Sequence, residues 1–397
     1  MQNYHKHTYW SNPSTPDSAA SYEDYAKRAV QLGHRILSSV EHGWQGYYYE
    51  VFELAQKYNL KFIFGAEAYW VKDRLEKDKS NNHIVILAKN EKGRRAINAA
   101  LSTANEDGYY FKPRLDIELL LSLPPDDVFV TTACVAFWKY DDSVEIVKQL
   151  HDHFKDNFML EIQYHNTPEQ ISLNAKIKEL SQQLGIEMIV GLDSHYIYPE
   201  QAQEREYVLE AKKLKYPDED GWYMDYPSDE EIMNRFLVQN VFSQEEIQRA
   251  MDNTDITLSF DDIVFDKEIK LPTLYKDKTQ EEKNKIFSRL ITKLFKEYTS
   301  GMPKEMYDMY YEGVKKEVDV YKETDMVDYP LIDYEIVQEA LRNGGMITPS
   351  GRGSGCGFFT NSLLGFSKVD RFTSPVKLYP ERFISKTRIL ETHSLPD

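Results

Sequence analysis

Five of the ten histidines stand with other metal-ligand residue types in or at the ends of expected strands. His5 and His7 form an H-x-H pair near the start of the chain, and Asp193 and His195 form a D-x-H pair. Residues two apart on a strand point to the same face, so both side chains of each pair can reach one metal ion. The spacing therefore predicts metal ligation at both places.

Four more residues of ligand type occupy similar places. These are His42 at the end of the second expected strand, Glu67 in the third, His83 at the start of the fourth and Cys134 at the end of the fifth. Eight such donors on one rim would hold two or three Zn²⁺ or Mn²⁺ ions, and such a cluster suits phosphoryl displacement. A lone strand-end histidine is more often structural and a lone cysteine is usually core, so the prediction depends on the conjunction of the two pairs.

The elements that must position these residues follow from the apolar pattern of the first two hundred residues. Expected strands alternate with amphipathic helical stretches, which predicts an α/β fold with a mainly parallel sheet, and we favour a barrel because its strand ends converge on one rim. The strands are expected at 3–10, 35–42, 61–71, 82–90, 128–137, 158–165 and 187–196.

Composition limits the function classes. The net charge of −17 does not by itself indicate a nucleic-acid partner, but residues 341–397 hold eight Lys and Arg against four Asp and Glu. The two cysteines argue for a reducing, cytoplasmic compartment and against a disulfide scaffold. No apolar stretch is long enough to predict a membrane helix.

Several motifs together resemble a known family. The stretches "HKHT", "EHGWQGYYYEV", "GAEAYW", "HIVILAKN", "LEIQYH" and "DSHY" are similar to the PHP (polymerase and histidinol phosphatase) domain that opens the α subunit of the family C replicative DNA polymerases of the DNA polymerase III type, from bacteria or phage. "GRGSGCGFFTNSLLGFSKVD", "LYPERFIS" and the final "LPD" resemble the start of that polymerase's palm. The resemblance covers nearly the whole chain.

The resemblance implies a distorted seven-stranded PHP (β/α) barrel, then a mostly helical segment and an incomplete polymerase palm. It divides the chain into a PHP metal-binding domain at 1–205, an acidic helical connector at 206–270 and the N-terminal part of a palm at 271–397. It also implies a trinuclear site with nine ligands, of which the eight residues above fill eight. The ninth position is Ser14 here instead of an acid, and Asp17, three residues on, is the alternative although its register differs.

The second half carries an expected nucleotide site. Glycine-rich turns expose backbone N–H groups, and Arg352 within "GRGSG" adds a cation that suits a polyphosphate. The resemblance implies that Gly353 and Ser354 contact the triphosphate of the incoming dNTP and that Arg382 contacts a phosphate. It makes Asp397 the first catalytic carboxylate of a Mg²⁺-binding pair whose second member lies beyond the chain, so we expect no polymerisation by this chain alone.

The function expected from this resemblance is DNA-directed DNA synthesis by a larger or split nucleotidyltransferase, with a PHP site that carries 3′→5′ exonuclease activity in some members. The implied partners are primer–template DNA, dNTPs, the remaining polymerase fragment or a spliced continuation, and a sliding clamp bound through the missing part. Two alternatives stay open: a free-standing PHP phosphoesterase, which would not need "GRGSG" or "LYPERF", and a non-catalytic PHP scaffold.

Overall fold

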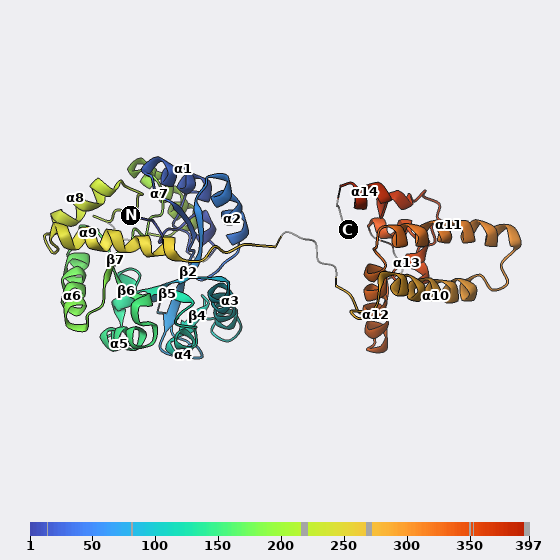
Figure 1. Cartoon of the computed structure of the whole chain (residues 1–397), viewed down its shortest axis with the longest axis horizontal. Helices are drawn as coiled ribbons and strands as arrows, with labels where there is room; N and C mark the ends of the chain where they lie inside the picture. Colours follow the sequence, from blue (N-terminus) through green and yellow to red (C-terminus); the bar gives the residue numbers. More distant parts are fainter. Residues whose placement is uncertain are drawn as a thin grey trace. The chain divides into compact units, whose positions relative to one another are not determined.

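Two compact units make up the chain, Met1–Phe265 and Asp266–Asp397 (Figure 1). The structure, a computed structural model, describes residues 1–13, 15–80, 82–215, 221–266, 272–348, 351 and 353–392. Each unit has a hydrophobic core of its own, so the two are treated separately.

A curled seven-stranded sheet forms the centre of the first unit. The strands lie in the order β1-β2-β3-β5-β6-β7, with β4 beside β2. All pairings are parallel except those of β3, which is antiparallel to both β2 and β5. This arrangement confirms the predicted α/β fold. The strands are β1 (Ile36–Ser39), β2 (Lys61–Val71), β3 (Asn82–Ala88), β4 (Arg114–Asp116), β5 (Val128–Thr131), β6 (Phe158–Ile162) and β7 (Met188–Val190).

Two expected strands differ from the structure. Segment 3–10 is not a strand: its backbone forms an isolated parallel bridge, between Lys6 and Ser194 in the loop after β7, and then enters the short helix η1 (Tyr9–Ser11). The strand expected at 187–196 is only β7, because the backbone of Asp193 adopts a left-handed conformation with φ of 45°. Neither segment keeps the continuous backbone ladder of a strand. Single backbone hydrogen bonds hold it instead, such as that from the N–H of His195 to the oxygen of Met224, and alternation of residue types does not reveal this.

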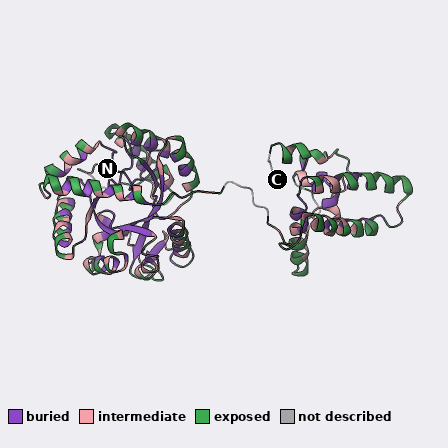
Figure 2. Cartoon of the chain, viewed as in Figure 1, coloured by how far each residue is buried: buried purple, intermediate pink, exposed green. Residues whose placement is uncertain are grey.

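Helices surround the sheet, and nearly every residue of the strands is buried (Figure 2). The helices are amphipathic as predicted: α1, for example, buries Tyr25, Ala26 and Ala29 on one face. It begins with a capping box between Ser21 and Asp24. The helices are α1 (Tyr22–Leu32), α2 (Tyr48–Lys57), α3 (Glu91–Glu106), α4 (Ile117–Leu121), α5 (Ser143–Phe154), α6 (Pro168–Leu184), α7 (Ala202–Lys212), α8 (Asp229–Gln239) and α9 (Gln244–Asp252).

The segment expected to be an acidic connector takes part in the core of the first unit. Ile232 and Phe236 of α8 and Ile247 of α9 are buried in the same hydrophobic cluster as the sheet. Beyond α9, Phe265 packs its ring against Phe52 at a centroid distance of 5.0 Å. The compact unit therefore extends to residue 265.

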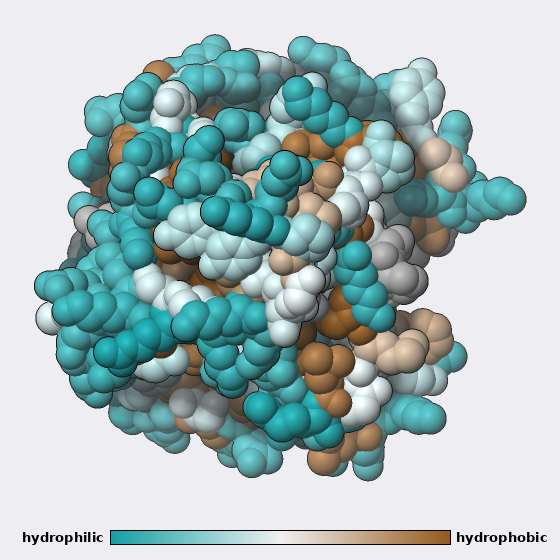
Figure 3. All heavy atoms as spheres, turned by 90° about the vertical axis from the view of Figure 1, so that its right-hand side faces the viewer, coloured by the Kyte–Doolittle hydropathy of each residue, from teal (hydrophilic) through white to brown (hydrophobic). Residues whose placement is uncertain are grey.

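In the described part of the second unit the regular elements are helices. The buried carboxylate of Glu317 on α11 accepts hydrogen bonds from the backbone N–H groups of Phe359 and Thr360 at the start of α13, and also pairs with Arg371. The face of the chain drawn in Figure 3 is covered mainly by hydrophilic side chains with smaller hydrophobic patches between them. The helices are α10 (Gln280–Tyr298), α11 (Lys304–Glu323), α12 (Asp328–Arg342), α13 (Phe359–Leu363) and α14 (Lys386–Leu390).

Candidate metal centre

Seven of the eight residues predicted as ligands come together in the first unit. Their donor atoms form three interleaved groups, each with all atoms within 4.8 Å of one another. The groups share members, as ligands that bridge neighbouring ions would. They are His5, His7, Glu67 and Asp193; His7, His42 and His195; and His42, Glu67 and His83.

The sheet explains why these residues meet. Glu67 lies within β2, and His42 pairs with it through an isolated parallel bridge just beyond β1. Because β3 runs antiparallel to β2, its first residues lie beside the end of β2, and His83 pairs with Tyr69 there. The N-terminal segment and the loop after β7 are joined by the Lys6–Ser194 bridge, which brings both paired motifs to the same rim.

Contacts inside the cluster are short. Oε2 of Glu67 lies 2.6 Å from Nδ1 of His42 and 3.2 Å from Nε2 of His7, while its Oε1 lies 3.0 Å from Nδ1 of His83. Oδ1 of Asp193 lies 3.4 Å from Nε2 of His5 and 3.2 Å from Nε2 of His7. Glu67 and Asp193 are therefore the anionic centres around which the imidazoles are arranged.

Burial and charge move several pKa values in this cluster. Burial alone would lower the pKa of His7, but Glu67 and Asp193 outweigh it and raise that pKa to about 10. His42 goes the other way: burial, reinforced by the charge of His7, lowers its pKa to about 4. Burial would raise the pKa of Glu67, yet the surrounding imidazoles hold it well below its usual value. Protons on some imidazoles thus balance carboxylates that stay ionised.

The same atoms fit divalent ions. Nε2 of His5 and His7, both ring nitrogens of His42 and both oxygens of Glu67 are buried and make no hydrogen bond within the described part of the chain. Buried polar groups in native proteins normally have hydrogen-bond partners, and a divalent cation among these converging atoms would serve as their common partner. Imidazole nitrogens with carboxylate oxygens are the donors that Zn²⁺ and Mn²⁺ accept.

Cys134, the eighth predicted ligand, lies at the edge of the cluster. Its Sγ is 3.5 Å from Nδ1 of His83, although it belongs to none of the three groups. Burial, with Asp193 and Glu67 adding to it, raises the pKa of the thiol well above its usual value. In this environment the thiol keeps its proton unless a cation is present.

Asp17 also reaches the cluster. Its Oδ2 lies 3.4 Å from Nε2 of His195 and 3.9 Å from Nε2 of His42, and its Oδ1 is buried without a hydrogen bond in the described part of the chain. Burial would raise the pKa of Asp17, but His195 and then His42 lower it to about 2. Ser14, the position at which an acid was expected, lies outside the described residues.

Sequence reasoning missed Glu161, a buried acid in the middle of β6. One of its oxygens lies 2.8 Å from Nδ1 of His5, and the other accepts hydrogen bonds from the hydroxyls of Tyr4 and Thr131. Such a carboxylate fixes the orientation of an imidazole whose other nitrogen faces a metal. The signal was available: Glu161 interrupts the otherwise apolar run "FMLEI".

The predicted nucleotide residues of the second unit share a pocket of about 300 Å³. Gly353, Ser354 and Arg382 line it together with Lys377. Gly353 has a φ of 80°, a conformation that glycine adopts without strain. Arg352 and Asp397 lie outside the described residues.

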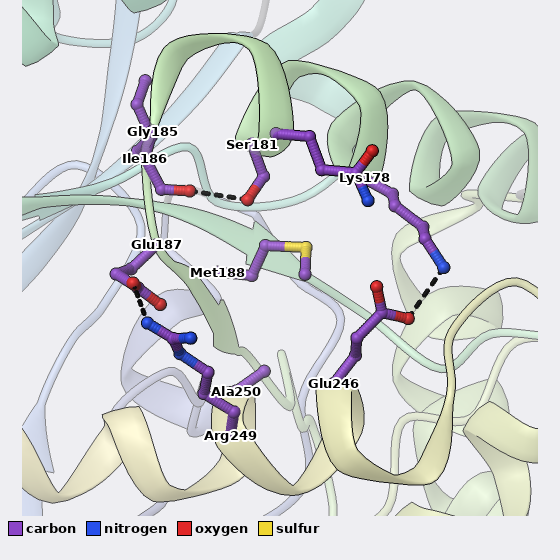
Figure 4. Close-up of a pocket in the computed structure, with 10 residues that line it drawn as sticks. Lys178, Ser181, Gly185, Ile186, Glu187, Met188, Glu246, Arg249 and Ala250 are labelled. Atoms are coloured by element: carbon purple, nitrogen blue, oxygen red, sulfur yellow. Dashed lines mark hydrogen bonds and ion pairs between the residues drawn. The ribbon is translucent and has the colours of Figure 1, made fainter.

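Another pocket, of about 220 Å³, lies between α6, β7 and α9 (Figure 4). It is at the start of β7, whereas Asp193 and His195 follow the end of that strand. Its charged groups are paired with each other: Lys178 lies 2.7 Å from Glu246, and Arg249 contacts Glu187. We assign it no role in the chemistry of the cluster.

Each of the two compact units contains a match to one protein family. Residues 3–165 match the model of the PHP domain, and residues 283–397 match that of the bacterial DNA polymerase III alpha NTPase domain. None of the described helices has the length and apolar character needed to cross a membrane.

Curated relatives are similar along almost all of the chain. The DNA polymerase III subunit alpha of Aquifex aeolicus is 26% identical over 99% of this chain and 35% of its own length, and that of Helicobacter pylori is 25% identical over 99% and 34%. The subunit of Deinococcus radiodurans is 30% identical over 62% of this chain and 19% of its own length. The chain thus spans about a third of the length of the first two relatives.

Two solved structures are similar to about half of the chain. An amidohydrolase from Chromobacterium violaceum covers 52% of it at 14% identity with a TM-score of 0.35, over 96% of that structure. A putative metal-dependent phosphoesterase from Bifidobacterium adolescentis covers 58% at 13% identity with a TM-score of 0.34, over 94% of that structure.

Proposed function

We propose that this chain is the N-terminal part of a DNA polymerase III α subunit, because two of its segments match the PHP and DNA polymerase III alpha NTPase families and nearly its whole length is similar to such subunits. In that role it contributes to DNA-directed DNA synthesis together with the rest of the subunit, since the chain spans about a third of the length of its first relatives. Primer–template DNA and dNTPs are its substrates, a sliding clamp is reached through the remaining part, and the cytoplasm is where it works.

The first unit holds two or three Zn²⁺ or Mn²⁺ ions in this proposal. The observation that carries it is the set of buried donor atoms in the three interleaved groups that have no hydrogen bond in the described part of the chain. Asp17 completes the second group in place of the acid absent at Ser14, and Cys134 joins His83 at the third. Bound together, such ions supply a water of lowered pKa and a clamp for phosphate oxygens.

We propose 3′→5′ exonuclease activity as the chemistry of this centre. The chain's own residues hold the site: Glu161 orients His5, and Glu67 and Asp193 provide the negative charge that retains cations. A phosphodiester can reach the centre from the side of His83 and Asp193, whose side chains are 16% and 11% accessible to solvent. His5 and His7 are fully buried, so the substrate does not enter past them.

A nuclease assay tests this proposal. The purified chain is given a primer with a mismatched 3′ end and Mn²⁺ or Zn²⁺, and bound metal is counted in parallel. We expect degradation that stops with EDTA and in Asp193→Asn, while Asp152→Asn on the surface of α5 behaves like the parent. Bound metal without degradation would contradict the nuclease but keep a metal-stabilised scaffold, and absence of bound metal would contradict the centre itself.

We further propose that the pocket lined by Gly353, Ser354, Lys377 and Arg382 binds the triphosphate of a dNTP. Two cations and a glycine-rich turn in one pocket support this assignment. Mg²⁺ and the carboxylate pair that begins at Asp397 belong to the completed enzyme. Arg382→Ala should weaken binding of dATP about tenfold in equilibrium dialysis. The control Arg342→Ala, on α12, should bind dATP as the parent does. If Arg382→Ala also binds dATP as tightly as the parent, the assignment is contradicted.

A further inference from the structure

Lys112 lies beside the metal cluster without a carboxylate partner. Its ammonium donates hydrogen bonds to Oγ1 of Thr15 at 2.8 Å and to the hydroxyl of Tyr69 at 3.0 Å, and these two oxygens are themselves 2.6 Å apart. The ammonium also lies 4.3 Å from the centre of the Tyr69 ring. Both partners are neutral, so the positive charge of Lys112 is not cancelled within this triangle.

Several other lysines of the described chain pair with a carboxylate instead. Lys57, Lys61 and Lys72 each lie 2.7 to 2.8 Å from a carboxylate oxygen. Lys112 is partly buried, and among the described residues no carboxylate comes within the 4 Å of an ion pair. Partial burial of an ammonium is costly unless an anion approaches it, so the position favours a ligand that brings negative charge.

The triangle formed by Lys112, Thr15 and Tyr69 lies next to the solvent-accessible side of the metal cluster. The ring of Tyr69 lies 5.3 Å from that of His83, the most exposed of the clustered histidines, and 6.0 Å from that of His42. Tyr69 follows Glu67 by two residues on β2 and so shares its face. Thr15 precedes Asp17 by two residues, so the turn that presents Asp17 to His195 also holds Lys112.

The backbone around Lys112 is fixed. Tyr110 and Lys112 form an isolated bridge, and the guanidinium of Arg114 donates to the backbone oxygens of Gly108 and Glu76. Gly43, next to His42, has a φ of 75°, and a Cβ there would come within 2.9 Å of the Tyr69 ring. The ammonium is therefore held in place before any ligand arrives, which lowers the entropy cost of binding.

We propose that Lys112, held by Thr15 and Tyr69, binds a non-bridging oxygen of the phosphate group whose ester is presented to the metal centre. This inference rests on the proposed metal-dependent phosphoesterase function and adds the residue that recognises the anion. A lysine acts on phosphate as a compact point charge with rotatable donors, which suits a phosphate whose orientation is set by metal ions.

Phosphate binding by the full zinc-loaded chain tests the proposal without requiring turnover. Inorganic phosphate and thymidine 5′-monophosphate are titrated by calorimetry into the parent chain, Lys112→Met, Lys112→Arg and the control Lys92→Met, an exposed lysine of α3. We expect Lys112→Met to weaken both probes about tenfold, Lys112→Arg to recover most of that loss, and Lys92→Met to match the parent. Zinc content and the melting temperature should be the same in all four.

The outcomes separate this inference from the proposed function. If the parent binds zinc but Lys112→Met binds both probes as tightly as the parent, the phosphate role is overturned while the metal centre stands. If Lys112→Met loses zinc or melts earlier, Lys112 is a structural residue and the inference is also overturned. A parent chain that binds no zinc overturns the proposed centre, and the inference falls with it.

Discussion

Asp17 reaches the metal cluster from a turn, with its carboxylate beside His195 and His42. If it is a ligand, replacing it removes a negative donor from the second group while leaving a side chain of the same shape. We expect Asp17→Asn to bind fewer zinc equivalents than the parent, or to weaken the most labile zinc by about 10- to 100-fold, measured by competition with a chelator. Asp152→Asn on α5 is the control, and unchanged zinc affinity in Asp17→Asn would exclude Asp17 as a ligand.

The stability of the folded chain should depend on pH through His165. Burial lowers its pKa to about 3 in the folded chain, where its Nδ1 accepts a hydrogen bond from the backbone N–H of Tyr223. The unfolded chain takes up that proton near pH 6.5, so His165 contributes stability above this pH that is lost as the pH falls towards 3.

The experiment compares how steeply the free energy of unfolding changes with pH in the parent and in a variant without His165. Between pH 6 and 4 the metal-free His165→Gln variant should lose stability less steeply than the parent, by up to about 1.4 kcal/mol per pH unit, in urea unfolding at each pH. His151→Gln on α5 serves as the matched histidine variant. Identical slopes for His165→Gln and the parent would mean that His165 has the same pKa in the folded and the unfolded chain, which would contradict the prediction.

Residue types and spacing were enough to predict the donors of the cluster but not its supports. His5, His7, Asp193 and His195 follow from two short paired motifs, and the structure places all four together. Glu161 was missed because its partner His5 is remote in sequence and only the folded sheet brings them together. Asp17 could not be placed by counting, since the position of a carboxylate in a turn depends on the path of the turn.

At the scale of the elements, the loop after β7 and strand β6 must approach very closely. A Cβ on Gly191 would lie 2.0 Å from Oε1 of Glu161, the oxygen that contacts His5. Gly191→Ala should therefore displace Glu161, cost about 1 to 3 kcal/mol of stability and weaken zinc binding. The measurements are chemical unfolding and chelator competition.

A double-mutant cycle controls this prediction. Shortening the acid in Glu161→Asp withdraws the carboxylate from Gly191, so the combined variant should lose less stability than the two single variants added together. Additive losses would show that Gly191→Ala acts on the backbone rather than through Glu161.

Strand order was only partly accessible to sequence reasoning. The alternation of apolar runs with amphipathic stretches predicted the α/β fold, but the antiparallel direction of β3 depends on pairings between β2, β3 and β5 that no local pattern contains. That direction has a consequence for the site, because it places His83 at the start of its strand on the rim where the other strands end.

At the scale of the whole molecule, each of the two units has its own hydrophobic core. All the candidate ligands lie in the first unit, and the glycine-rich pocket lies in the second. Residues 206–265 belong to the first core through α8 and α9. Their polar contacts add to this: the side chain of Gln239 donates to the backbone oxygen of His165, and Oγ1 of Thr254 accepts from the N–H of Gln2, three residues before His5.

Truncation at two points tests how far the metal-binding unit extends. The fragment 1–265 should unfold cooperatively and bind the same number of zinc ions as the whole chain, because Phe265 and the α8–α9 segment stay in place. The fragment 1–205 loses Ile232, Phe236 and Ile247, each worth about 1.5–3 kcal/mol of burial, a total comparable with the stability of a typical domain. We expect it to show no cooperative transition by circular dichroism and no stoichiometric zinc. If 1–205 folds and retains its zinc, the helices after residue 205 only cover a sheet that is stable without them, and the contacts of Thr254 and Gln239 are not needed to hold the N-terminal histidines in place.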